Sequence, residues 1–202
     1  MYTSADIVAK ATAIRNFCKE RLDFQRNPID DSLSPVAPFW LGNKDIKVFL
    51  IGQDPTIRNK SRRNNISCTL NLDKTGSLKR YIAQILEGLG LSEDQVYATN
   101  LFKYFYTRPP AETIEVLQQH LFSNLELLNR ELLMFPNAIV ITLGEPLLKL
   151  IVRKKPETLG KMTRFWDYDF RKRASGGNFS FLSSEKNLLE RDIFPLPHQP
   201  SL

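Results

Sequence analysis

Hydrophobic residues recur along this chain in two patterns, short continuous runs and longer stretches with helical spacing. Continuous apolar runs occupy 46–51, 96–101 and 138–143, which is typical of strands buried on both faces. Helical spacing predicts helices over 3–22, 77–89, 112–135 and 145–154. Buried strands separated by helices indicate an α/β protein with a parallel sheet reached by right-handed crossovers.

Turn and capping residues mark the ends of several of these elements. The first helical segment begins Thr-Ser-Ala-Asp, so Ser or Thr is expected to cap it. Ser77 can cap the second helix, which should stop at Gly90. Toward the end of the chain we expect a strand near 179–182 and a short strand from Ile193 that enters a proline-stiffened turn.

Composition is ordinary for a soluble globular protein. The chain has 202 residues, of which 42% are hydrophobic and 25% charged, and this length suits one domain, with 1–45 as an N-terminal helix and lead-in. The formal net charge of +6 favours a polyanionic partner.

Cysteine and histidine are scarce. Cys18 and Cys68 are too few for a disulfide framework, and two histidines give no Cys/His metal spacing. We therefore expect a reducing compartment and no metal or cofactor. No apolar signal core or membrane-length segment occurs, so a cytoplasmic protein is expected. We also expect a monomer.

Candidate chemistry begins directly after the first predicted strand, where the chain reads Gly52-Gln53-Asp54-Pro55. Glycine tolerates unusual backbone angles, and proline pushes Asp54 into an extended conformation. Ligands bind at the carboxyl ends of strands in open α/β sheets, so Asp54 is a candidate site residue. The alternative is that Asp54 only caps the next segment.

Two further polar side chains follow strands in the same way, Asn100 after the second and His198 after the last. The carboxyl ends of parallel strands share one edge, so Asp54, Asn100 and His198 are expected to lie together. Taken singly, Asn100 could cap a turn and His198 could be an exposed terminal residue.

The order of these motifs resembles the uracil-DNA glycosylase superfamily, most closely its uracil-excising branch, from about residue 46 to the end. Gly52 to Pro55 is similar to the first motif of that branch, and Ser77-Leu78 to a dipeptide that opens a helix. Tyr97 to Asn100 is similar to its strand ending in asparagine, and Pro197 to Leu202 to its His-Pro-Ser motif.

This resemblance implies a three-layer α/β/α fold with a central, mostly parallel four-stranded sheet, and an enzyme that acts on DNA. It implies that Asp54 orients the hydrolytic water, that Asn100 reads the uracil edge and that His198 faces O2 of uracil. Gln53, Thr56 and Cys68 would fall beside the base. Ser77, Ser201 and Leu202 would fall beside DNA.

The chain also departs from the pattern of that branch. Thr56 stands where the branch has the tyrosine that blocks the thymine methyl, and Cys68 stands at the aromatic residue that stacks on uracil. Gln199 lies between His198 and Pro200, and Leu202 is either the apolar wedge or the wedge is missing. Two cysteines cannot form the four-cysteine iron-sulfur site of other branches.

The expected chemistry explains why these residue types are needed. Cleavage of an N-glycosidic bond builds positive charge on the sugar and negative charge on the base, so an anion and a hydrogen-bond donor suit the two sides. Asp54 and His198 fit these roles, and Asn100 can bond N3–H and O4 of uracil together. The basic residues after the turn, which could hold phosphates or form only a solvated loop, are Arg58, Lys60, Arg62 and Arg63.

Other residues are better explained by packing. His120 is expected on a helix surface or in packing, and the aromatic run 102–106 in the core. Three functions remain open: a DNA glycosylase-like hydrolase, a nucleic-acid-binding module that kept the fold without the chemistry, and a protein that handles a small nucleotide or nucleobase.

Overall fold

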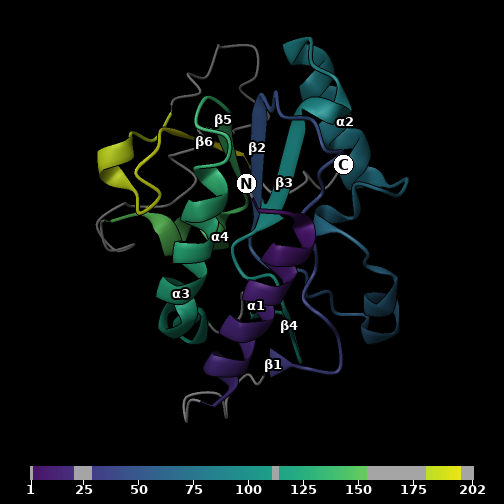
Figure 1. Cartoon of the computed structure of the whole chain (residues 1–202), viewed down its shortest axis with the longest axis vertical. Helices are drawn as coiled ribbons and strands as arrows, with labels where there is room; N and C mark the ends of the chain where they lie inside the picture. The colour runs from purple at the N-terminus through teal and green to yellow at the C-terminus, as the bar shows by residue number, and fades with distance from the viewer. Residues whose placement is uncertain (1, 21–28, 111–113, 154–180, 197–202) are drawn as a thin grey trace, which may run out of the picture.

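A computed structural model describes residues 2–20, 29–110, 114–153 and 181–196 of the chain. Its centre is a four-stranded, all-parallel sheet (Figure 1). In the order β3-β2-β5-β6, the strands are β3 (Val96–Asn100), β2 (Val48–Gly52), β5 (Ile139–Leu143) and β6 (Ile193–Leu196). The predicted α/β fold with a parallel sheet is confirmed.

Helices cover both faces of this sheet. Phe49 and Ile51 of β2 point into a cluster shared with α1 (Ser4–Lys19), α3 (Ile114–Leu132) and α4 (Glu145–Ile151). Val48 and Leu50, on the opposite face, pack with α2 (Ser77–Leu89). All five residues of β2 are buried, which explains why its sequence is continuously apolar.

Strand register aligns the carboxyl ends of the sheet. Along β2 and β3, Val48 pairs with Val96 and Gly52 with Asn100. On the other side of β2, Ile51 pairs with Thr142 of β5. Residues that follow β2 and β3 therefore leave the sheet at the same edge.

Capping agrees with the sequence at α1 and differs at α2. Thr3 and Asp6 form a reciprocal capping box at the start of α1, so a threonine caps this helix as predicted. Helix α2 ends at Gly90 in the left-handed conformation (φ 65°), as predicted. The capping prediction for Ser77 is wrong, because Ser77 is the first helical residue and Gly76 occupies the cap position.

A second, two-stranded sheet pairs β1 (Ile29–Asp30) with β4 (Phe105–Tyr106) in antiparallel fashion. These strands are too short for a sequence pattern to reveal them. The aromatic run that contains β4 is buried, as expected. Of the strand predicted near 179–182, Leu182 forms an isolated bridge with Ile193, while 179–180 lie outside the described residues.

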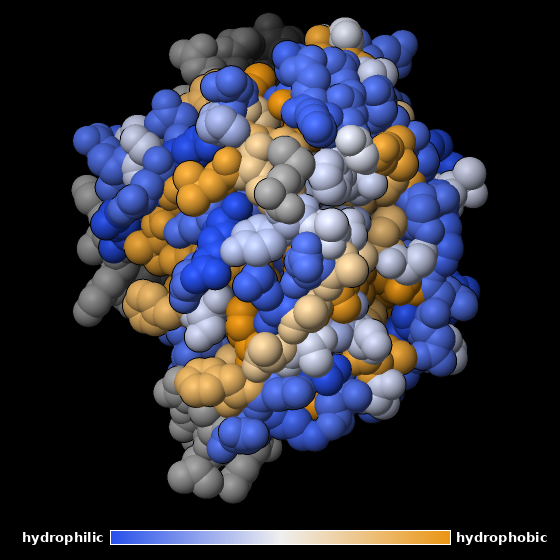
Figure 2. All heavy atoms as spheres, in the orientation of Figure 1, coloured by the Kyte–Doolittle hydropathy of each residue, from blue (hydrophilic) through white to orange (hydrophobic). Residues whose placement is uncertain are grey.

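The outer surface is mainly polar where α2 covers the sheet, at upper right in Figure 2. Among the helices that the structure describes, none combines the length and apolar character needed to cross a bilayer.

A buried ion pair joins α3 to the end of β3. Lys103 and Glu131 are 1% and 0% exposed, and Lys103 Nζ lies 2.5 Å from Glu131 Oε1. Lys103 Nζ also donates to the carbonyl oxygen of Asn100 (2.8 Å), and Tyr97 OH donates to Glu131 Oε2 (2.6 Å). Burial beside this carboxylate raises the pKa of Tyr97, so the phenol keeps its donor proton. The end of β3 is thus tied to α3 through charged groups away from water.

Breaking this pair from one side should be costly. Lys103→Met or Glu131→Gln alone would leave an unpaired buried charge, so each should lower the free energy of unfolding by about 3–5 kcal/mol, while the double variant recovers most of the loss. Urea denaturation measures all three. The matched control is the half-exposed pair Glu145 and Lys149, where the same cycle should change stability by about 0.5 kcal/mol or less. Equal effects at the two pairs would contradict this role.

Candidate active site

The turn after β2 holds the Asp54 carboxylate through both of its oxygens. The backbone N–H of Thr56 donates to Asp54 Oδ1 (2.8 Å), and Gln53 Nε2 donates to Asp54 Oδ2 (2.8 Å). An aspartate that accepts from the backbone two residues later is a common turn arrangement, which accounts for the local fold. Because the Gln53 side chain donates to the second carboxylate oxygen, Gln53 helps to orient the Asp54 carboxylate.

The segment after β3 fixes this turn from outside. Leu101 and Phe102 donate backbone hydrogen bonds to the carbonyls of Gly52 and Gln53, each at 2.9 Å. Tyr106 N donates to Thr56 Oγ1 (2.9 Å), so the Thr56 hydroxyl braces the turn against β4. The predicted contact of Thr56 with a base stays a prediction, but its hydroxyl already has a structural partner.

Burial dominates the electrostatics of Asp54. Although the side chain keeps partial exposure, the protein packed around it raises the pKa of the carboxyl above its ordinary value. Hydrogen bonds from Thr56 and Gln53 and the charge of Arg63 act in the opposite direction. Holding this group ionised therefore costs folding free energy.

Asn100 lies directly beside the start of the turn. Asn100 is 1% exposed, and its Oδ1 has no hydrogen-bond partner among the described residues. A Cβ placed on Gly52 would come within 2.4 Å of this oxygen, so only glycine leaves room for the carboxamide. An acceptor left open at the carboxyl edge of the sheet can take a hydrogen bond from a group supplied from outside. The structure thus sets Gly52, at the start of the turn, beside Asn100. The predicted grouping of Asp54, Asn100 and His198 stays a prediction.

A strained turn, η3 (Thr69–Asn71), closes over the same point. Leu70 and Asn71 both have left-handed backbone angles, with φ of 59° and 51°. For leucine this conformation costs about 1–2 kcal/mol, whereas asparagine adopts it more readily. Leu70 Cδ2 would lie 3.1 Å from a Cβ on Gly52, so its side chain reaches the place that the Asn100 amide occupies. No sequence pattern indicated this conformation.

Cys68, expected beside the base, points elsewhere. Its Sγ donates to Asp73 Oδ1 (3.1 Å), and its side chain packs with Leu50 and Leu72 in the cluster under α2. Burial, with Asp73 nearby, raises the pKa of the thiol to about 11. Among the described residues, Cys68 and Cys18 form no disulfide.

The basic loop after the turn divides into two parts. Arg58, Lys60 and Arg62 are exposed, which leaves them accessible to phosphates. Arg63 is 1% exposed, and its guanidinium donates to the carbonyls of Ile57, Tyr106 and Thr107 and pairs with Asp30. The predicted phosphate contact of Arg63 is wrong, because its side chain is buried and four of its five N–H donors have partners inside the protein.

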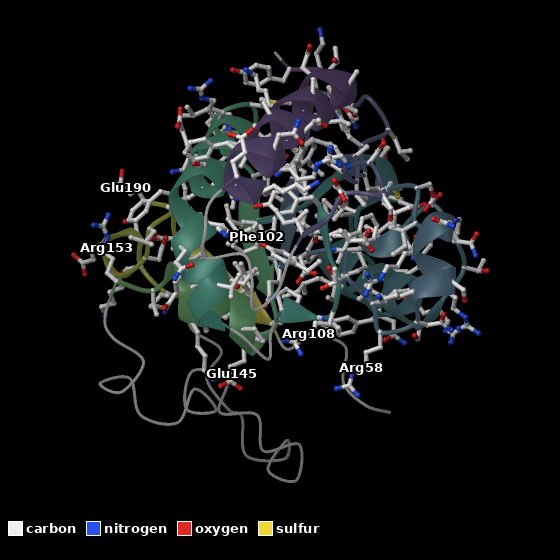
Figure 3. The ribbon with its side chains drawn as sticks, turned by 90° about the horizontal axis from the view of Figure 1, so that it is seen from below. Arg58, Phe102, Arg108, Glu145, Arg153 and Glu190 are labelled. Atoms are coloured by element: carbon white, nitrogen blue, oxygen red, sulfur yellow. The ribbon has the colours of Figure 1, made fainter. Side chains whose placement is uncertain are left out.

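Arg108 is an exposed cation that the sequence analysis did not single out. Figure 3 views the molecule from below and shows Arg58 and Arg108 projecting on the same side. Arg108 follows β4, whose pairing with β1 was not predictable, so its neighbourhood was not predictable either.

His120 belongs to a buried polar network in the core. Its Nδ1 lies 3.2 Å from Tyr106 OH, and Asn124 Nδ2 donates to Tyr104 OH (3.0 Å) and to the His120 carbonyl (2.8 Å). The packing interpretation of this histidine is confirmed.

Part of the predicted site lies outside the described residues, namely His198, Gln199, Ser201 and Leu202. Ser77, predicted beside DNA, is exposed at the start of α2. Within the described ranges, no three Cys, His, Asp or Glu side chains gather as a metal ion would require.

Substitution at Gly52 tests the close approach to Asn100. Gly52→Ala should lower the unfolding free energy by about 1–3 kcal/mol, because the added Cβ would overlap Asn100 Oδ1 in a packed site. Gly88→Ala is the control, since a Cβ there has open space within α2 and should raise stability by up to about 1 kcal/mol. Denaturation curves with the same sign for both variants would contradict the close approach.

Substitution at Asp54 tests the raised pKa. The folded state holds this proton more tightly than the unfolded state, so ionisation lowers stability as pH rises from the ordinary aspartate pKa through the raised one. The stability of Asp54→Asn relative to the parent should therefore increase over this window and then level off. Denaturation from about pH 3 to about pH 8 measures it.

Asp94→Asn should show the opposite trend. A hydrogen bond from Ser92 lowers the pKa of this exposed carboxyl, so the parent gains relative stability as pH rises through that lower range. If the stability difference between Asp54→Asn and the parent did not change with pH, the raised pKa of Asp54 would be contradicted.

Comparison with known proteins places most of the chain in one family. Residues 39–202 match the family model described as the Uracil DNA glycosylase superfamily, which covers most of the chain, and the chain belongs to this family. No curated protein matches it.

Proposed function

We propose that this member of the uracil DNA glycosylase superfamily hydrolyses the N-glycosidic bond of uracil, or of a related altered base, in DNA. Family membership supports a DNA glycosylase-like function, and members of the family act on DNA. The proposal for this chain goes further, to the base and to the residues that act on it.

The observation that carries the proposal is the unpartnered Oδ1 of Asn100. A buried acceptor favours a ligand that brings a donor, and N3–H of uracil is such a donor. Cytosine offers an acceptor at N3 and would leave two acceptors opposed. Thymine has the same hydrogen-bonding edge as uracil, so the amide alone does not separate these two bases.

Asp54 supplies the charge for the sugar side of the reaction. As the C1′–N1 bond breaks, positive charge grows on the sugar, and a carboxylate held from both oxygens can stabilise it and position water. The electron pair leaves with the base as an anion, the oxygen of the positioned water bonds to C1′, and the proton that this water loses passes to the Asp54 carboxylate. The resemblance of residues 197–202 to the last motif of the family implies that His198 faces O2 of uracil, where it would stabilise this anion.

DNA must also be held while the base leaves the stack, which costs a few kcal/mol. The exposed cations Arg58, Lys60 and Arg62 follow the turn directly and suit contacts with phosphates. The net charge of +6 would further assist association with a polyanion.

Base release from uracil-containing oligonucleotides tests the proposal. Single- and double-stranded substrates should yield abasic sites, detected as alkali-sensitive breaks. Asp54→Asn should reduce the rate by about 10² or more, because the charge near the sugar is lost. Asp45→Asn is the matched control: this exposed aspartate precedes the other end of β2 and should leave the rate unchanged.

The pH profile separates a catalytic Asp54 from a structural one. If the ionised form acts, the rate should rise with pH through the raised pKa of Asp54, above the ordinary aspartate range. Absence of release from uracil, hypoxanthine and mismatched thymine would overturn the enzymatic proposal. Salt-dependent DNA binding without base release would then favour a binding module.

A further inference from the structure

Leu70 combines a strained backbone with a partly buried side chain that packs against the hydrophobic cluster under α2. Its φ of 59° and ψ of 10° lie in the left-handed region, and Asn71 follows it there. Strained residues of this kind cluster at ligand sites, where the surrounding structure holds them in place. The conformation therefore calls for an explanation at this particular position.

The residues on either side hold this turn firmly. Thr69 is fully buried and donates to the Ala37 carbonyl through both its backbone N–H (2.9 Å) and its hydroxyl (3.1 Å). Leu72 is buried under α2, and Lys79 Nζ donates to its carbonyl (2.6 Å). Leu70 projects between these two anchored residues, and part of its side chain remains exposed.

The Leu70 side chain meets the Asn100 amide at Gly52. Leu70 Cδ2 and Asn100 Oδ1 lie 3.1 Å and 2.4 Å from the place where a Cβ on Gly52 would be. An apolar group and an unpartnered acceptor thus converge on one point at the sheet edge. Ligand sites combine these features, since apolar walls contact the ligand while a few polar groups fix its orientation.

We propose that Leu70 is a base-contact residue, whose side chain packs on the face of the base that Asn100 reads along its edge. The ligand class is a planar heteroaromatic base, apolar on its faces and polar on its edges. The left-handed backbone is retained because it directs this side chain over Gly52. This inference rests on the proposed function, in that Asn100 receives the base.

Glycine and alanine at this position separate backbone strain from side-chain contact. Leu70→Gly adopts positive φ without strain, whereas Leu70→Ala keeps it, so the glycine variant should unfold at the higher temperature of the two. Both lose the contact, so both should lower kcat/KM on a uracil oligonucleotide by about tenfold or more. Leu70→Met should restore part of the rate.

Glu190→Gly is the matched control. Glu190 is exposed, has φ 53° and lies in the 181–196 segment outside the candidate site, so relief of its strain should raise stability and leave the rate unchanged. A purely structural Leu70 would give rates that follow stability, with Leu70→Gly above Leu70→Ala. That order, or parental rates for both variants, would overturn the proposal.

A binding measurement keeps this test separate from catalysis. Free uracil is titrated into protein with labelled leucine methyl groups, and the Leu70 signals, assigned with Leu70→Met, should shift. The control signals are those of Leu91, which follows α2 and packs against the cluster under that helix, and they should not shift. Shifts without excision would reject the proposed enzyme and retain Leu70 as the base contact. Excision by the parent protein without Leu70 shifts would reject the contact alone.

Discussion

Backbone pairing between β2 and β3 sets Gly52 beside Asn100, and the missing side chain at Gly52 leaves the room that the Asn100 carboxamide occupies. Because the strands are parallel, the turn carrying Asp54 leaves the sheet at the same edge. Burial on both faces makes this register hard to change, since a slip of one residue would turn every side chain to the opposite layer. The position of the candidate site follows from this pairing.

Three features of the site cost folding free energy. Burial raises the pKa of Asp54, so its ionised form is disfavoured; Asn100 Oδ1 lacks a partner among the described residues; and Leu70 holds a left-handed backbone. Each cost falls at the point where the proposed reaction requires a charge, a hydrogen bond or an apolar contact. Such costs are tolerated when the surrounding structure is firm.

That firmness comes from interactions one layer further out. Lys103 binds the Asn100 carbonyl and pairs with Glu131, which ties the end of β3 to α3. Arg63 joins the loop after the Asp54 turn to β1 and β4 through hydrogen bonds to carbonyls and an ion pair with Asp30. Both cations lie inside the protein, so a net positive charge does not by itself mark a nucleic-acid surface.

The sequence by itself determined the parallel α/β architecture and the end of α2 at Gly90, because these depend on local periodicity and on turn chemistry. Pairing of β2 with β3 sets Gly52 beside Asn100, and the predicted grouping of Asp54, Asn100 and His198 stays a prediction. Only the tertiary structure decided that Arg63 is internal, that Cys68 points to Asp73 and that Leu70 closes over Gly52. Those outcomes depend on contacts between segments far apart in the chain. Burial and left-handed backbone angles are set by such neighbours, which a linear pattern of residues does not contain.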